Sequence, residues 1–314
     1  MYKHLFGPIP SRRLSISLGI DLVPKKVCSL DCVYCEVGKT TNLTTDRLPY
    51  VKASDVIEEL EDFFKKNPDP DFLTFSGYGE PLLNSEIGQI VRYVKKSKPN
   101  ISLALLTNSM ALIDRSVWPE LMDIDVILPS MDAVTQPVFE KINRPHSSLS
   151  VDEYIDAIID FRKQFKNKMW LEILILPGYN DAMEELLAFK DRIVAIGADS
   201  VQLNTLDRPG TVGDIRPATR AELQSIIDLW QFDSVEIISS SVNRKDQRAY
   251  QVNVSDAVLN TVSRRPCTLD DLSTVLGIHY NVINKYLEIL VEEGKIVASR
   301  GERGLFYQTS DGNC

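Results

Sequence analysis

Residues 28–35 read Cys-Ser-Leu-Asp-Cys-Val-Tyr-Cys and directly follow an apolar, strand-like stretch at residues 14–23. Iron–sulfur clusters are held by cysteine thiolates, and a cubane of four irons normally takes four of them. This loop supplies three, and no fourth cysteine lies nearby. A cubane bound here would keep one iron open to a small molecule. The spacing therefore predicts a [4Fe–4S] cluster with a catalytic role on Cys28, Cys32 and Cys35.

Two other interpretations of the cysteine loop stay open. Structural zinc sites also use closely spaced cysteines, but they close four ligands with a second Cys or His pair, and none stands at a suitable spacing. Three unrelated buried thiols are the second alternative. The remaining cysteines, Cys267 and Cys314, cannot hold a second cluster alone, and we expect both to be incidental.

The composition is that of an ordinary globular protein with room for about two domains. The chain has 314 residues, 44% hydrophobic and 25% charged. Its 35 Lys and Arg against 44 Asp and Glu give a net charge of −9, which excludes a blanket polyanion binder. No apolar stretch reaches the ~20 residues that cross a bilayer, and residues 1–10 show no signal-peptide pattern. We expect a cytoplasmic protein, in which thiolates stay reduced.

Residues 14–238 alternate short apolar runs with longer amphipathic stretches, a pattern typical of βα repeats. Ser54 precedes an apolar pattern of helical spacing. Two pairs, Ser150 with Glu153 and Thr219 with Glu222, match the capping box, and Gly197 is expected to end a helix. The predicted strands are residues 14–23, 72–75, 101–106, 124–128, 171–176 and 200–203, with a further peripheral strand at 235–238.

Strands separated by helices predict right-handed crossovers and a parallel sheet. Six βα units are fewer than the eight of a closed barrel, so we expect an α/β fold that forms a partial, open (βα)6 barrel. The chemistry of such folds lies at the carboxyl ends of the strands. The cysteine loop follows the first strand, and further polar or glycine-rich segments follow later ones: residues 77–81, 107–109, 130–132 and 177–180.

The C-terminal part of the chain predicts a second, smaller domain. We assign residues 1–240 to the barrel, residues 241–254 to a linker and residues 255–314 to a winged helix-turn-helix domain. The domain is expected to contain helices at 255–263, 269–276 and 280–293 and strands at 295–299 and 305–308.

With these motifs placed, residues 7–240 resemble the radical S-adenosylmethionine (SAM) superfamily. The spacing Cys28-x3-Cys32-x2-Cys35, with Tyr34 before the third cysteine, is similar to the cluster loop of that family. The resemblance implies that SAM chelates the fourth iron and is cleaved by one electron to a 5′-deoxyadenosyl radical, which abstracts hydrogen from a substrate. It also implies a flavodoxin-like or ferredoxin-like electron donor.

The resemblance extends to the other loops. Gly77-Tyr78-Gly79-Glu80 resembles the family's glycine-glycine-glutamate motif, whose backbone meets the methionyl amino group of SAM. Glycine suits that role because a β-carbon would hinder close approach of the backbone. The positions that the resemblance assigns to the ribose or the methionyl carboxylate are Asn108, Ser130 and Asp132, with Glu172 as a further candidate. Ordinary turn chemistry is the alternative for Asn108, Ser130 and Asp132.

Within the superfamily, three segments resemble the branch that contains wyosine-base synthases. They are residues 7–13, residues 142–145 and the run from Asn204 to Gly210. The true synthases carry a second set of cysteines upstream of the cluster loop, whereas residues 1–27 here contain none. We therefore do not transfer their pyruvate-condensing chemistry, and no cobalamin-binding domain is present.

The substrate stays open. Four arginines near strand ends, Arg12, Arg13, Arg144 and Arg208, suit either a phosphate-bearing substrate or internal salt bridges. From residue 255 on, six basic face eight acidic residues, so nucleic-acid binding by the second domain depends on a local basic stripe. The stripe would draw on Arg244, Lys245, Arg248, Arg264, Arg265, Arg300 and Arg303.

Three function classes follow. The first is a radical enzyme that modifies RNA or a nucleotide, with the second domain positioning the substrate. The second acts on a peptide or small metabolite, and its second domain docks a protein; a purely structural or dimerising role for that domain also stays open. The third is a non-enzymatic iron–sulfur regulator that reads DNA through its winged helix.

Overall fold

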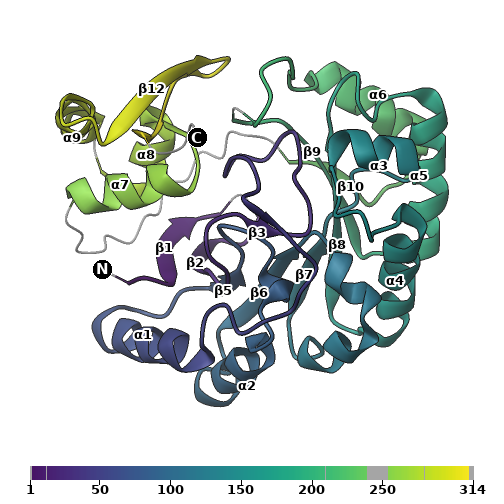
Figure 1. Ribbon diagram of the computed structural model, residues 1–314, viewed down its shortest axis with the longest axis horizontal. Helices are drawn as coiled ribbons and strands as arrows, with labels where there is room; N and C mark the ends of the chain where they lie inside the picture. Colours follow the sequence, from purple (N-terminus) through teal and green to yellow (C-terminus); the bar gives the residue numbers. More distant parts are fainter. Residues whose placement is uncertain (1, 12, 209, 239–253, 279, 311–314) are drawn as a thin grey trace.

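The computed structural model describes residues 2–11, 13–208, 210–238, 254–278 and 280–310. Its larger part is an eight-stranded sheet in the order β1-β2-β5-β6-β7-β8-β9-β10. β1 pairs antiparallel with β2, and all other neighbours are parallel. The sheet curves with helices along its outside (Figure 1), which makes the fold a partial βα barrel. The strands are β1 (Leu5–Pro10), β2 (Ile16–Ile20), β5 (Phe72–Phe75), β6 (Ser102–Thr107), β7 (Val126–Pro129), β8 (Lys168–Ile175), β9 (Ser200–Thr205) and β10 (Val235–Ile237).

The six predicted parallel strands and the peripheral seventh are all present, within a few residues of the expected bounds. β1 was not predicted. Its sequence contains Gly7, Pro8 and Pro10, which argue against a central strand but are tolerated at the edge of a sheet. A separate two-stranded parallel ladder, β3 (Val27–Cys28) with β4 (Asn42–Leu43), carries the first cysteine.

Helices connect the strands on the outer face. Thr219 and Glu222 form the predicted capping box of α6, and Gly197 ends α5 in the left-handed conformation. The capping box predicted at Ser150 is wrong: Ser150 is the N-cap of α4, but its side chain makes no capping hydrogen bond, and Gln136 Oε1 accepts from the first amide, Val151 N, at 2.9 Å. The helices of this part are α1 (Ala53–Lys66), α2 (Ile87–Ser97), α3 (Gln136–Ile142), α4 (Val151–Gln164), α5 (Met183–Ile196) and α6 (Arg220–Trp230), with short 3₁₀ turns at Pro81–Leu83, Met110–Ile113 and Arg115–Glu120.

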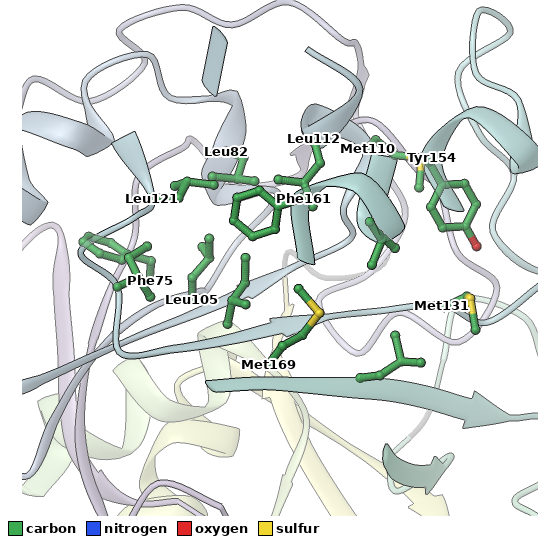
Figure 2. Packing of buried hydrophobic residues seen from close by; sticks show 14 of the residues in the cluster. Phe75, Leu82, Leu105, Met110, Leu112, Leu121, Met131, Tyr154, Phe161 and Met169 are labelled. Carbon is green, nitrogen blue, oxygen red and sulfur yellow. The ribbon is translucent and has the colours of Figure 1, made fainter. Parts of the chain in front are cut away.

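The two faces of the sheet have different cores. On the outer face, Phe75, Leu105 and Met169 pack beneath the helices against side chains such as Phe161 (Figure 2). Alternate residues of the same strands point to the inner face. There a separate apolar cluster joins Leu14, from the β1–β2 turn, with Ala104, Val126 and Leu128. The turn therefore fills the amino-terminal end of the barrel and leaves the carboxyl-terminal end for loops.

The C-terminal part has its own small core. It contains α7 (Val254–Arg264), α8 (Leu269–Leu276) and α9 (Tyr280–Glu292) and a three-stranded sheet in the order β11-β13-β12. β12 (Ile296–Gly301) and β13 (Gly304–Thr309) form the expected hairpin, while the short β11 (Cys267–Thr268) was not predicted. Figure 1 shows this C-terminal unit beside β1. Residues 241–253 of the predicted linker and Cys314 lie outside the described residues, and α7 begins at Val254.

Candidate functional site

Each sulfur of the cysteine loop accepts a hydrogen bond from a different segment of the chain. Nitrogen donors aimed at sulfur are what a thiolate ligand needs, because they offset its negative charge. The pairs are Asn108 Nδ2 to Cys28 Sγ at 3.5 Å, Asn143 Nδ2 to Cys32 Sγ at 3.4 Å and Lys26 Nζ to Cys35 Sγ at 3.0 Å.

The surroundings of these thiols disfavour free thiolates. Burial raises the pKa of Cys28 to about 12, and burial likewise raises the pKa of Cys32. Both thiols therefore stay protonated at neutral pH until a metal displaces their protons. Burial by itself would lower the pKa of Lys26, but the neighbouring cysteines, Cys35 foremost, raise it overall. Lys26 is only 3% exposed and has a φ of +62°, an uncommon conformation for a lysine.

The geometry of the cysteine loop differs from that of a mononuclear metal site. Among the described residues, no three His, Cys, Asp or Glu side chains gather around a single metal position. A cubane has a different requirement, since each cysteine ligates its own iron.

The glycine loop, residues 77–80, is bound to the segment just before Cys28. Lys26 N donates to Tyr78 O at 2.8 Å, and Glu80 N donates to Val27 O at 3.1 Å. A β-carbon at Gly79 would lie 2.0 Å from Val27 O, so only glycine permits this approach. At Gly77, where φ is +129°, a β-carbon would lie 1.5 Å from Asp21 Oδ1. The two glycines are thus required by the packing of this loop.

Glu80 is buried, and its carboxyl oxygens accept hydrogen bonds from neighbouring groups of the chain. It accepts from Thr107 Oγ1 at 2.7 Å, Asn108 N at 2.8 Å and Leu82 N at 3.1 Å. Burial raises its pKa to about 7, although these hydrogen bonds act in the opposite direction. Glu80 therefore ties the glycine loop to the end of β6 and positions Asn108.

Asn108, Ser130 and Asp132 line one pocket, as their places after β6 and β7 predict. Asp132 is 3% exposed, and burial raises its pKa to about 6. It accepts from Leu174 N at 2.9 Å and from the Tyr34 hydroxyl. The other residues that line the pocket are Leu30, Tyr34, Met110, Phe139, Asn143 and Tyr154.

Asn143 was not predicted as a site residue. It binds Cys32 Sγ through Nδ2 and also approaches Asp132 Oδ2 at 3.3 Å, yet its buried Oδ1 finds no partner among the described residues. A buried acceptor of this kind needs a donor from a ligand or from water. Asn143 belongs to the segment 142–145. The resemblance of that segment to the wyosine branch was the only feature of the sequence that pointed to Asn143. No sequence pattern pointed to Lys26 as a site residue, because its contact with Cys35 depends on the fold.

Glu172 does not belong to this pocket. Its carboxylate pairs with Arg13 NH1 at 2.7 Å and accepts from Asn204. Arg13 also donates to Gln202 Oε1 at 3.1 Å. Both contacts are to Glu172 Oε1, and Arg13 reaches it from the turn after β1, a strand that was not predicted.

Two of the four strand-end arginines form internal salt bridges. Arg13 pairs with Glu172, and Arg208, which is 7% exposed, pairs with Glu36 at 3.1 Å. Arg144 is exposed, and Arg12 lies outside the described residues. For Arg13 and Arg208 the structure thus shows salt bridging and no free guanidinium.

The proposed basic stripe also loses two members. Arg264 pairs with Asp21, and Arg303 donates to both carboxylate oxygens of Asp271, at 3.1 and 3.0 Å. Arg303 also contacts Asp207 Oδ1 at 3.3 Å. These arginines face the barrel, since Asp21 and Asp207 belong to it. The residues 244, 245 and 248 of the stripe lie outside the described residues.

Residues 22–189 match the radical SAM superfamily. The chain belongs to this superfamily. Its fold agrees, because a solved structure of TYW1 with a lysine-pyruvate adduct bound superposes with a TM-score of 0.52 at 15% identity, over 73% of this chain and 76% of that one. Members of the superfamily are enzymes that use a [4Fe–4S] cluster and SAM.

Curated relatives cover most of the chain. A UPF0026 protein of Methanocaldococcus jannaschii is 29% identical over 313 residues, 96% of this chain and 94% of the relative. A protein of Brachyspira hyodysenteriae named GTPase Obg is 30% identical over 295 residues, but the chain spans only 43% of that relative's length. More distant relatives are a probable dual-specificity RNA methyltransferase RlmN of Thermotoga petrophila, 24% identical over 62% of this chain and 56% of that protein, and a GTP 3′,8-cyclase of Limosilactobacillus fermentum, 25% identical over 52% of this chain and 46% of that protein.

None of the described helices is long and apolar enough to span a membrane.

Proposed function

We propose that Cys28, Cys32 and Cys35 hold the [4Fe–4S] cluster of this radical SAM enzyme. The observation that carries the proposal is the set of three separate nitrogen donors, one on each sulfur. Hydrogen-bond donors to the ligand atoms of a metal site orient those ligands and tune the properties of the metal. Lys26 would add a positive charge at Cys35, which suits a cluster that must accept an electron.

SAM would bind in the neighbouring pocket. Gly77, Gly79 and Glu80 shape the loop beside Cys28, and Asn108, Ser130 and Asp132 line the cavity. The unpartnered Oδ1 of Asn143 would accept a hydrogen bond from the SAM nucleoside. When bound, the cluster supplies one electron that breaks a carbon–sulfur bond of SAM, leaving methionine and a 5′-deoxyadenosyl radical that takes hydrogen from the substrate. Buried walls such as Phe139 and Tyr154 would keep water from this radical.

For the substrate we propose RNA or a nucleotide. The support is the similarity to proteins named as an RNA methyltransferase and a GTP cyclase. In this proposal residues 255–314 are a winged helix-turn-helix domain that positions the substrate, the enzyme is cytoplasmic, and a flavodoxin-like or ferredoxin-like protein supplies electrons.

A peptide or small metabolite is the second candidate, and one observation favours it. α9 exposes Tyr280, Val282, Ile289 and Val291, between 40% and 47% each, together with the acidic residues Glu288 and Glu292. An apolar, acidic helix suits a protein surface better than a phosphate backbone.

Anaerobic reconstitution tests the reaction. We expect about four irons and sulfides per chain and release of 5′-deoxyadenosine under dithionite. A full cluster that never yields adenosyl fragments would refute the proposal, as would zinc bound tightly in its place.

Mass spectrometry of RNA and metabolites from cells with and without the protein then separates the substrate classes. RNA binding that weakens steeply with salt supports the first class. Absence of RNA binding, with a modified peptide or metabolite, supports the second.

A further inference from the structure

One arginine of the C-terminal unit contacts the glycine loop of the barrel. Arg264, the last residue of α7, donates from NH1 to Asp21 Oδ2, and the two side chains are 14% and 4% exposed. Its guanidinium carbon lies 4.0 Å from the ring centroid of Phe6 and 4.8 Å from that of Tyr78. Burial lowers the pKa of Arg264 to about 10, so it stays cationic at neutral pH. The arginine is thus held by one carboxylate and two aromatic faces.

Asp21 is the link between this arginine and the loop. Its Oδ1 accepts from Tyr78 N at 2.8 Å and occupies the space where a side chain of residue 77 would begin. The position of Asp21 therefore determines the path of Gly77 and Tyr78. The Tyr78 carbonyl in turn holds the Lys26 amide, two residues before Cys28.

A second contact joins the same two segments. The Tyr78 hydroxyl and Ser263 Oγ lie 3.1 Å apart, so two adjacent residues at the end of α7 contact the Tyr78 side chain, and Arg264 also reaches the loop backbone through Asp21. The loop is the only part of the predicted SAM contacts that we find bound to the C-terminal unit in the described residues. Its path therefore depends on how that unit docks.

We propose that Arg264 is a positioning residue for SAM, contributed by the C-terminal unit. Through Asp21 it holds the backbone of residues 77–80 in the shape that receives the methionyl end of SAM. This rests on the proposed function, in which that loop contacts SAM. SAM binding and the docking of α7 are then coupled. Bound SAM strengthens the contact of α7 with the barrel by the same free energy by which that contact strengthens SAM binding.

The test is SAM affinity in the reconstituted full-length enzyme without reductant, so that SAM is bound and not cleaved. Equilibrium dialysis with labelled SAM gives Kd for Arg264→Gln, Arg264→Lys and wild type. We expect Arg264→Gln to weaken SAM binding about tenfold at unchanged iron content. The Kd of Arg264→Lys should lie between those of wild type and Arg264→Gln, since lysine keeps the charge but loses the planar stacking. The matched control is Arg300→Gln, an exposed arginine of β12, which should bind as wild type does.

A folded Arg264→Gln enzyme with wild-type SAM affinity would overturn the inference and leave the proposed function intact. A wild-type enzyme that carries the cluster but binds no SAM would refute the proposed function instead.

Hydrogen exchange of α7 in the wild type covers the case in which Arg264→Gln does not fold. SAM should slow exchange at the end of α7 and leave α9 unchanged. Equal exchange in α7 with and without SAM would also overturn the inference.

Discussion

The cysteine loop and the face between the C-terminal unit and the barrel both bury polar groups, but they satisfy them differently. Around the cysteines, amide and ammonium groups of the barrel point at sulfur, and carboxylates such as Glu80 accept backbone amides. At the other face, full charges pair across the two parts of the chain, as in Arg208 with Asp271. The first arrangement suits the proposed cluster site, and the second joins the two units through charge pairs. Each prediction below tests one side of this contrast.

The largest effect is expected in the cysteine loop. Cys32→Ala removes one of three thiolates, so iron should fall from about four per chain to near zero and SAM cleavage should disappear. Cys267→Ala, in the core of the C-terminal unit, should keep iron and cleavage. Iron and sulfide analysis after anaerobic reconstitution decides. Equal iron loss in both variants would show that the cluster is not confined to this loop.

The next largest effect concerns the docking face. Arg208→Met removes the buried cation next to Glu36, Asp207 and Asp271. Asp207 and Asp271 keep their contacts with Arg303, so the free energy of unfolding should fall by about 3 kcal/mol. Arg216→Met removes an arginine from an exposed pair with Glu222 and should leave the melting temperature unchanged. Calorimetry measures both. A similar melting temperature for Arg208→Met and wild type would mean that these charges do not hold the units together.

Glu80 links stability to pH. Because burial raises its pKa from 4.5 to about 7, its contribution to stability is complete below pH 4.5 and is lost as pH rises through 7. The loss is about 3 kcal/mol in the metal-free protein. Between pH 5 and pH 8, the melting temperature of Glu80→Gln should therefore fall by about 5 °C less than that of the wild type. The exposed Glu58→Gln should retain the wild-type pH profile; parallel profiles for all three proteins would contradict the buried, titrating carboxyl.

The smallest effect is expected at Asn143. Asn143→Ala removes a donor to Cys32 and the free acceptor toward the pocket, so SAM should bind about fivefold more weakly with the iron content unchanged. Asn284→Ala, which loses only a surface bond to Glu288, is the control. If both variants bind SAM as tightly as the wild type does, Asn143 lines the pocket without contributing to SAM binding.

Much of the barrel follows from local pattern. Six strands and a seventh were predicted because apolar runs of strand length alternate with helical periodicity. Thr219 begins α6 and Gly197 ends α5, as their residue types suggest. Two details differ from the local pattern. The Ser150 side chain makes no capping hydrogen bond although Glu153 stands at the expected position, and β1 forms by pairing with β2 although Gly7 and Pro8 disfavour a strand.

The site divides in the same way. Asn108, Ser130 and Asp132 come together because the carboxyl ends of neighbouring parallel strands share one edge. Glu172 lies outside the lining of the pocket that these residues share, and Arg13 pairs with it from 159 positions away. Lys26 lies only nine positions from its partner Cys35, but its positive φ is a backbone conformation that no local pattern predicted.

The amino-acid sequence alone placed three thiols within eight residues, a spacing that predicts a cluster site. It also determined the alternating barrel, because periodicity is local. Only the tertiary structure decided which charges face inward. Arg264 and Asp21 are separated by 243 positions, and Arg208 and Glu36 by 172. No spacing rule connects residues at such distances. The sequence therefore left Arg208 open between substrate binding and a salt bridge and counted Arg264 toward a basic stripe, whereas packing pairs Arg208 with Glu36 and Asp271 and pairs Arg264 with Asp21.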